Sequence, residues 1–328
     1  MRVLITGGAG FIGSYLAETC LEINDEVYII DNLSTGSLDN LKHLQEDSRY
    51  KDRLFVHVDT IFNDKALLEL TGTCDVVFHL AAAVGVRYIL ANPLESIRTN
   101  ILGTENVLKH CARFKKKVLI ASSSEVYGKH LHAPLLETDN IIYGPSSKSR
   151  WSYATSKLMD EFIALAYHRT NGLNVFITRL FNTVGPRQSG AYGMVIPRFV
   201  SQALHNAPLT VYGDGTQSRT FTYVKDVVRG LRALVDSEAA VGEVFNVGGI
   251  QEITMLDLAR MIIRKTGSGS RIELIPYDQA FEKDFEDMQR RVPGIEKIKK
   301  VIAYDPKTDL ETILDHIIAH MKNSAAAQ

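Results

Sequence analysis

The sequence predicts an α/β fold built on a doubly wound parallel sheet, with a smaller and mostly C-terminal α+β domain. Short apolar runs alternate with helical stretches through the first half of the 328-residue chain, which is the order of a parallel sheet covered on both faces. The glycine-rich run GGAGFIG (7–13) directly follows the first apolar run, where a Rossmann-like sheet turns from strand to helix. After residue 180 this rhythm changes, and we expect the second, substrate-binding domain there.

Each expected element follows from a local pattern. Apolar runs predict strands at 2–6, 26–31, 54–58, 75–80, 117–122 and 174–180. Helical patterns predict helices at 11–22, 93–114, 151–170 and 197–206, and a strand–turn–strand unit is expected at 209–224. We therefore expect a nucleotide-binding domain over 1–180, joined by parts of 220–250, and a discontinuous substrate domain mainly over 181–328.

Composition and charge narrow the class of protein. With 45% apolar residues, 23% charged residues and a formal net charge of −1, the chain is an ordinary globular protein, and neither nucleic acid nor an anionic membrane is expected as its main partner. The three cysteines lack metal-ligand spacing, so we expect no metal and a reduced, cytoplasmic protein. Met1 leads straight into a strand, which leaves no room for a signal peptide, and no apolar run approaches the roughly 18 residues of a membrane span.

The glycine-rich run has the context of a dinucleotide-binding loop. Its glycines permit a tight turn and let the backbone approach a pyrophosphate, and the helix that follows offers free N–H groups to the phosphates. Asp31 ends the next strand, 18 residues after Gly13, where a carboxylate accepts hydrogen bonds from ribose hydroxyls and repels a 2′-phosphate. This favours NAD over NADP. Asp59, after the third strand, could contact the adenine or be a plain loop residue.

Tyr153 and Lys157 are the most informative pair in the chain. Residues four apart lie on one face of a helix. An ammonium beside a phenol favours the phenolate, so we expect a lowered Tyr153 pKa and a base that can take a proton from a sugar hydroxyl. Ser123, in SSSEVYG (122–128), would offer a hydroxyl to the same sugar oxygen. Glu125 could reach the substrate as acid or base, or could be a surface residue that caps a turn.

Six segments in order resemble the extended short-chain dehydrogenase/reductase family that modifies nucleotide sugars. They are GGAGFIG, DVVFHLAA (75–82), SSSEVYG, YATSK (153–157), RLFNTVGPR (179–187) and VYGDGTQSRTFTYV (211–224), and they extend over essentially the whole chain. The resemblance implies NAD as cofactor, a nucleotide sugar as substrate, and Ser123, Tyr153 and Lys157 as the catalytic group. It also implies that Asn182 and Arg219 bind the diphosphate and that Tyr212 lies near the nucleobase, although these three could instead form a turn, a surface ion pair and a core contact. The full set of implied cofactor contacts is Gly7, Gly10, Phe11, Ile12, Gly13, Asp31, Asn32, Asp59, Leu80, Ala81, Ala82, Tyr153 and Lys157, and that of substrate contacts is Asn182, Arg187, Tyr212, Arg219 and Arg291.

The resemblance leaves three reactions open, all of which begin with oxidation at the sugar C4. A 4-epimerase of the UDP-glucose or UDP-glucuronate type returns the hydride to the other face, a 4,6-dehydratase expels water, and a decarboxylase releases carbon dioxide from a uronic acid. Glu125 departs from the usual epimerase pattern, in which small or apolar residues follow the serines. The segment DMQRRVPGI (287–295) is similar to that of uronate decarboxylases and would make Arg291 catalytic, although Arg290 and Arg291 could be surface charges or nucleotide ligands. We therefore expect a UDP-glucuronate decarboxylase, a UDP-xylose synthase.

Two further expectations concern the protein as a whole. A dinucleotide-binding sensor without turnover would be expected to lack the serine or the tyrosine–lysine pair, and this chain keeps all three. The helical stretches 95–113 and 151–170 resemble those that pair across a two-fold axis in relatives, so a homodimer with a four-helix interface is expected, although amphipathic core helices would look similar.

Overall fold

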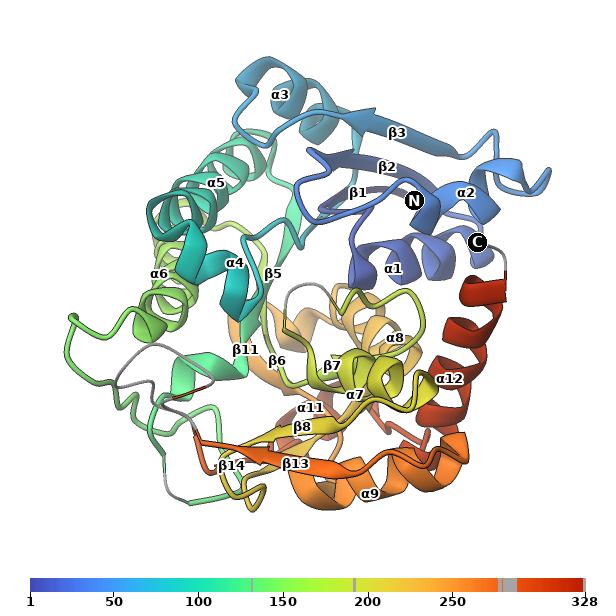
Figure 1. The fold of residues 1–328 in the computed structure, drawn as a ribbon. Helices are drawn as coiled ribbons and strands as arrows, with labels where there is room; N and C mark the ends of the chain where they lie inside the picture. Colours follow the sequence, from blue (N-terminus) through green and yellow to red (C-terminus); the bar gives the residue numbers. More distant parts are fainter. Residues whose placement is uncertain (131, 191–192, 277–278, 280–287, 327–328) are drawn as a thin grey trace.

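A seven-stranded parallel sheet forms the centre of the computed structural model, which describes residues 1–130, 132–190, 193–276, 279 and 288–326 (Figure 1). All six strand pairs run parallel, in the order β11-β6-β5-β4-β1-β2-β3. The strands are β1 (Arg2–Thr6), β2 (Glu26–Asp31), β3 (Leu54–Val58), β4 (Val76–His79), β5 (Lys117–Ser123), β6 (Val175–Leu180) and β11 (Glu243–Val247). The predicted Rossmann-like parallel sheet is confirmed.

Helices cover both faces of this sheet because successive strand residues point to opposite sides. Val3 and Ile5 of β1 pack on one face, against a core that includes residues of α1 (Phe11–Glu22), α2 (Asp39–Glu46), α8 (Val224–Leu234) and α11 (Glu296–Ile302). Leu4 packs on the other face, against α3 (Asp64–Thr73), α5 (Pro93–Phe114) and α6 (Arg150–Asn171). The predicted helices at 11–22, 93–114 and 151–170 correspond to α1, α5 and α6.

A second core lies below the carboxyl ends of the strands in Figure 1. It is built from α7 (Val195–Leu204), β8 (Leu209–Tyr212), α9 (Met255–Thr266), β13 (Ile272–Ile275) and α12 (Leu310–Ala326). The predicted strand–turn–strand unit does not form one ladder, since β8 pairs with β13, whereas β9 (Ser218–Thr220) pairs with β12 (Glu252–Thr254) and β14 (Arg290–Arg291). The shorter elements are α4 (Val86–Ala91), η1 (Ser124–Tyr127), β7 (Thr183–Val184), β10 (Thr222–Tyr223) and η2 (Glu238–Ala240).

The chain crosses between the two cores more than once. After β10 it returns to the large sheet through α8 and β11, and it then leaves again for β12 and α9. The exact division into two domains stays a prediction. Within the described part of the chain, no helix combines the length and the hydropathy that crossing a membrane would require.

Candidate active site

One cavity of about 860 Å³ is lined by every residue that the sequence analysis assigned to catalysis, to the cofactor or to the substrate. Its lining extends from the glycine loop after β1, past the ends of β4 and β5, to Tyr212 of β8, Arg219 of β9 and Arg291 of β14. The structure therefore brings together the predicted cofactor, catalytic and substrate residues. What each of them contacts decides what the site can do chemically.

The glycine loop forms a cradle for an anion. Gly7 has a left-handed φ of 75°, and a Cβ there would lie 2.7 Å from the Ala81 nitrogen. A Cβ at Gly13 would lie 2.3 Å from the Gly7 oxygen, so the first turn of α1 packs directly on the loop backbone. No side chain caps the N-terminus of α1, which leaves its N–H groups available for a phosphate.

The carboxylate of Asp31 shapes the other end of the cofactor half. Its Oδ2 accepts from the Ala9 backbone N–H at 2.9 Å, and its Oδ1 accepts from Leu33 N–H at 2.8 Å. Burial raises the Asp31 pKa above its usual range, against the lowering effect of these N–H groups. Asp59 accepts from Asn63 Nδ2 at 2.7 Å, so it also organises its own loop. These residues fit a nucleoside with free ribose hydroxyls.

The half-buried Tyr153 lies at the start of α6, with its phenol within hydrogen-bonding reach of Ser123. Its pKa is raised above 10, first by burial and then by the negative charge of Glu125, while the Ser123 hydroxyl lowers it. The expected lowering by Lys157 is wrong for this structure. The Lys157 ammonium instead donates to Asp160 Oδ2 at 2.7 Å, and the charge of Asp160 also opposes the phenolate. Sequence reasoning missed Asp160, although its i, i+3 spacing from Lys157 was visible.

Glu125 is an ion-paired group of the cavity and not a surface turn cap. It forms a salt bridge with Arg291, and Arg150 donates to its Oε2 at 3.2 Å. Burial disfavours the charged carboxylate, but Arg150 and Arg291 outweigh this effect and lower the Glu125 pKa to about 2. Arg291 also donates to Asn182 Oδ1 at 2.7 Å. Glu125 therefore contacts two guanidinium groups of the cavity lining.

The two arginines of β14 lie in different surroundings. Arg291 is 9% exposed and lies in the cavity, whereas Arg290 forms a surface pair with Glu252 at 2.8 Å. Adjacent strand residues point to opposite faces, which explains the split. Arg150 was missed by sequence reasoning, although it precedes Tyr153 by three residues and so lies on the same helical face.

The remaining predicted substrate residues surround the far end of the cavity. Arg219 is 7% exposed and donates to the Ser218 carbonyl at 2.7 Å, so it is a buried residue of the cavity lining and not a surface one. Tyr212 is half-buried, with the Arg198 guanidinium 4.1 Å from its ring centre, and is not a core contact. Arg187 donates to Glu18 of α1 at 2.6 Å, which places it beside the cofactor half of the cavity. The roles of these residues stay predictions.

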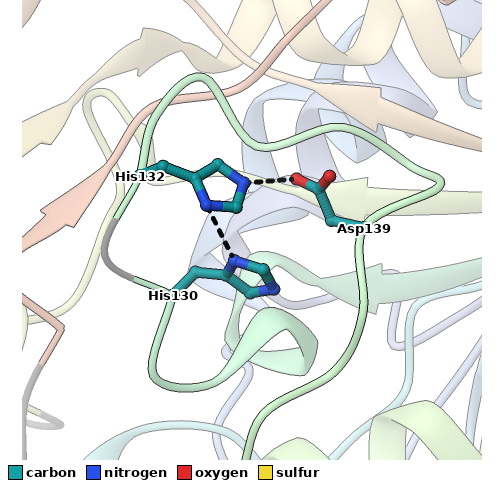
Figure 2. A group of neighbouring side chains, drawn as sticks. All are labelled: His130, His132 and Asp139. Atoms are coloured by element: carbon teal, nitrogen blue, oxygen red, sulfur yellow. Dashed lines mark hydrogen bonds and ion pairs between the residues drawn. The ribbon is translucent and has the colours of Figure 1, made fainter.

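A group with metal-ligand chemistry lies outside this cavity lining. Among the residues that the structure describes, His130, His132 and Asp139 alone bring together three side chains that could hold a metal ion (Figure 2). They belong to the loop between η1 and α6, and the sequence-based expectation of no metal did not consider them.

Comparisons with known proteins agree with this geometry. The sequence model of the GDP-mannose 4,6 dehydratase family matches residues 4–317. A UDP-N-acetyl-alpha-D-glucosaminuronate decarboxylase of Bacillus cytotoxicus is 40% identical, over 97% of this chain and 96% of its own length. UDP-glucuronic acid decarboxylase 1 of Arabidopsis thaliana is 37% identical, over 98% of this chain and 70% of its own length. The structure of a UDP-glucuronic acid 4-epimerase from Bacillus cereus in complex with UDP-glucuronic acid and NAD superposes with a TM-score of 0.88 and 29% identity, over 99% and 100% of the two chains.

Proposed function

We propose a reaction for this chain from the premise that it belongs to the GDP-mannose 4,6-dehydratase family of extended short-chain dehydrogenases/reductases. The proposed activity is NAD-dependent decarboxylation of a UDP-linked uronic acid, with UDP-glucuronate as substrate and UDP-xylose as product. The acetamido counterpart is a second candidate substrate, because the relative at 40% identity is named for it.

The observation that carries this proposal is the position of Arg291 beside Glu125 in the cavity lining. Arg291 is 9% exposed, and it donates to Asn182 Oδ1 at 2.7 Å. Its Nε has no hydrogen-bond partner among the described residues. A guanidinium binds carboxylates through charge-assisted hydrogen bonds. The C6 carboxylate of a uronic acid supplies such a group, whereas the neutral hydroxymethyl group of a hexose does not.

The side chains present suit both halves of such a reaction. Bound NAD would accept a hydride from the sugar C4 and later return it. Tyr153 takes the proton of the C4 hydroxyl, and Ser123 orients that hydroxyl. The C4 ketone makes C6 the carboxylate of a β-keto acid, so carbon dioxide would leave and the enolate would take up a proton from solvent at C5. The returning hydride and the proton held by Tyr153 would then restore the C4 alcohol. The Arg291 guanidinium would stabilise the negative charge of the enolate. Because Glu125 is ionised, its role in this arrangement is to hold the two arginines.

Product analysis tests the proposal. The purified protein would be incubated with NAD and UDP-glucuronate, and in parallel with the acetamido uronate, with Tyr153→Phe as the control. The proposal predicts released carbon dioxide and a UDP-pentose by proton NMR. A uronate inverted at C4 would show that the chain is an epimerase. A 4-keto-6-deoxy product from a UDP-hexose would show that it is a dehydratase. NAD binding without turnover of any nucleotide sugar would indicate a non-catalytic sensor.

We also propose that the protein is a homodimer built on a four-helix interface. Helices α5 and α6 lie side by side and expose large apolar side chains, including Leu94 at 61%, Leu102 at 54% and Phe162 at 60% exposure. Exposed apolar surface of this kind is typical of association sites. A cytoplasmic location is proposed as well, supported by three buried and unpaired cysteines.

A further inference from the structure

Asp160 is a buried carboxylate that the proposed reaction does not use. It is 0% exposed, it lies on α6 about two turns after Tyr153 and one turn after Lys157, and its Oδ2 accepts from the Lys157 ammonium at 2.7 Å. Its other oxygen, Oδ1, has no hydrogen-bond partner among the described residues. A buried carboxylate with one unsatisfied oxygen needs an explanation, because such groups are costly.

The neighbouring residue Glu161 shows that the contact with Lys157 is specific to Asp160. Glu161 points to a different partner and pairs with Arg179 at 2.8 Å, while it also accepts from Ser122. The two adjacent acids therefore neutralise two different cations. Only the Asp160 pair contains a residue expected to act on the substrate.

A series of polar side chains also connects Asp160 to the neighbouring strands β4 and β1 of the sheet. Burial raises the pKa of the Asp160 carboxyl above its usual range, while Lys157 and then Thr104 of α5 lower it. The Thr104 hydroxyl lies 2.9 Å from Nε2 of His79. His79 in turn lies 2.7 Å from the Thr6 hydroxyl, one residue before the glycine loop. Burial, and then the charge of Lys157, lower the His79 pKa to about 3, so this imidazole is neutral and adds no charge.

We propose that Asp160 is the counter-ion of the Lys157 ammonium and thereby a positioning residue that restrains ionisation of Tyr153. The inference rests on the proposed function, in which Tyr153 is the base. The charged groups that act on the phenol are Glu125, Asp160 and Arg291. Lys157 pairs with Asp160, Arg150 pairs with Glu125, and the neutral His79 lies beyond Lys157. In this set Asp160 cancels the cation that would otherwise favour the phenolate. The phenol then stays protonated until substrate and cofactor change the balance of charge.

Asp160→Asn removes the charge and keeps the shape. The phenolate of Tyr153 should then form at lower pH, by about one pH unit, which is at the low end of the effect of a nearby unit charge. Asp160→Glu should resemble the wild type. Glu161→Gln is the matched control, since it deletes a buried carboxylate of the same helix that does not pair with Lys157, and it should leave the phenolate titration in place.

The titration is read by tyrosinate absorbance of the NAD-loaded protein, as the difference between each protein and its Tyr153→Phe counterpart. The acidic limb of kcat/KM, measured with whichever nucleotide sugar is turned over, should move in the same direction. A titration of Asp160→Asn that coincides with the wild type overturns the inference. Asp160→Ser serves as the second variant if the asparagine variant does not fold. The absorbance needs no substrate, so a failure of the decarboxylase proposal would be seen separately.

An independent observation concerns His130 and His132, shown in Figure 2. The His130 Nε2 donates to the Asn140 carbonyl, and the His132 Nε2 donates to Asp139 Oδ2 at 3.3 Å. Since neither oxygen can donate, each ring carries its proton on Nε2 when neutral. The two Nδ1 atoms then face each other as lone pairs, 3.4 Å apart.

We infer that this pair of Nδ1 atoms is a cation site for a borderline divalent metal such as Zn²⁺. Two nitrogen ligands at about 2.0–2.1 Å from a tetrahedral ion lie about 3.3–3.4 Å apart, which matches the observed separation. The carbonyl and the carboxylate on the far nitrogens are the outer partners that orient metal-binding histidines. The same loop donates from Leu135 N–H to the Val292 carbonyl at 2.8 Å, so a bound ion would brace the segment that follows Arg291.

Competition for Zn²⁺ with a chromophoric chelator, on untagged protein, tests this site. The wild type should take one equivalent, and His132→Asn should weaken binding at least tenfold. His57→Asn, which changes an exposed histidine elsewhere, is the control and should bind like the wild type. Equal Zn²⁺ affinity for the wild type and the double variant His130→Asn/His132→Asn would overturn the assignment.

Discussion

Glu125→Gln is the most informative single change in the cavity, because glutamine keeps the shape and removes the charge between Arg150 and Arg291. These arginines lower the Glu125 pKa from 4.5 to about 2. Such a difference corresponds to about 3 kcal/mol of folding free energy at pH 7. The variant should lose about that much stability, and kcat/KM should fall by about a hundredfold because the two arginines lose their fixed positions.

The pH dependence of this loss has a definite sign. The carboxyl pKa is lower in the folded protein than in the unfolded chain, so its contribution is complete above pH 4.5 and disappears as the pH falls towards 2. The stability difference between wild type and Glu125→Gln should therefore shrink to about 2 kcal/mol near pH 3.5. Urea unfolding at the two pH values measures it.

Glu252→Gln is the matched control for this experiment. Glu252 also pairs with an arginine, Arg290, and its pKa is also lowered to about 2, first by the hydrogen bond from that arginine. The pair is exposed, with 49% of the Arg290 side chain and 29% of the Glu252 side chain accessible, so its contribution should stay at or below about 1 kcal/mol. If Glu125→Gln cost no more than Glu252→Gln, the reasoning about the buried cluster would be refuted.

Four further changes test other parts of the account. Tyr153→Phe should abolish turnover and leave NAD binding by fluorescence titration intact; retained turnover would contradict its role as base. Asp31→Ala should weaken NAD binding by about tenfold or more through loss of charge-assisted hydrogen bonds to the ribose, and an unchanged ratio of NAD to NADP affinity would count against this. Gly13→Ala places a Cβ 2.3 Å from the Gly7 oxygen and should lower both thermal stability and NAD affinity. Wild-type values for both would contradict this and show that the loop backbone can shift at little energetic cost. Phe162→Glu should give monomers in light scattering, whereas a persistent dimer would place the interface elsewhere.

The sequence predicted the parts of the site that depend on local pattern. Glycine spacing after a strand, and tyrosine and lysine one helical turn apart, identify the loop and the helix without knowledge of the fold. The sequence singled out Arg291 by resemblance but predicted no strand at 290–291, so it did not determine which of Arg290 and Arg291 faces the cavity. Which of them does so depends on how β14 lies against β9, a contact between segments about 70 residues apart.

Electrostatics was the least predictable part of the site. The expected effect of Lys157 on Tyr153 considered two residues of one helix, whereas the structure adds burial, Glu125 and the partner of the lysine, Asp160. Burial alone favours the neutral phenol. A pKa depends on every charge and on the solvent around a group, and a local sequence pattern contains only part of that information.

Isotopic labelling tests the central claim most directly. UDP-glucuronate would carry deuterium at C4 and carbon-13 at C6, and the products would be analysed after a single incubation with the protein and unlabelled NAD. Transient oxidation followed by loss of C6 predicts that the carbon-13 appears in carbon dioxide while the deuterium remains on C4 of the pentose. Carbon-13 retained in the sugar nucleotide, or deuterium absent from C4 of the product, would contradict it.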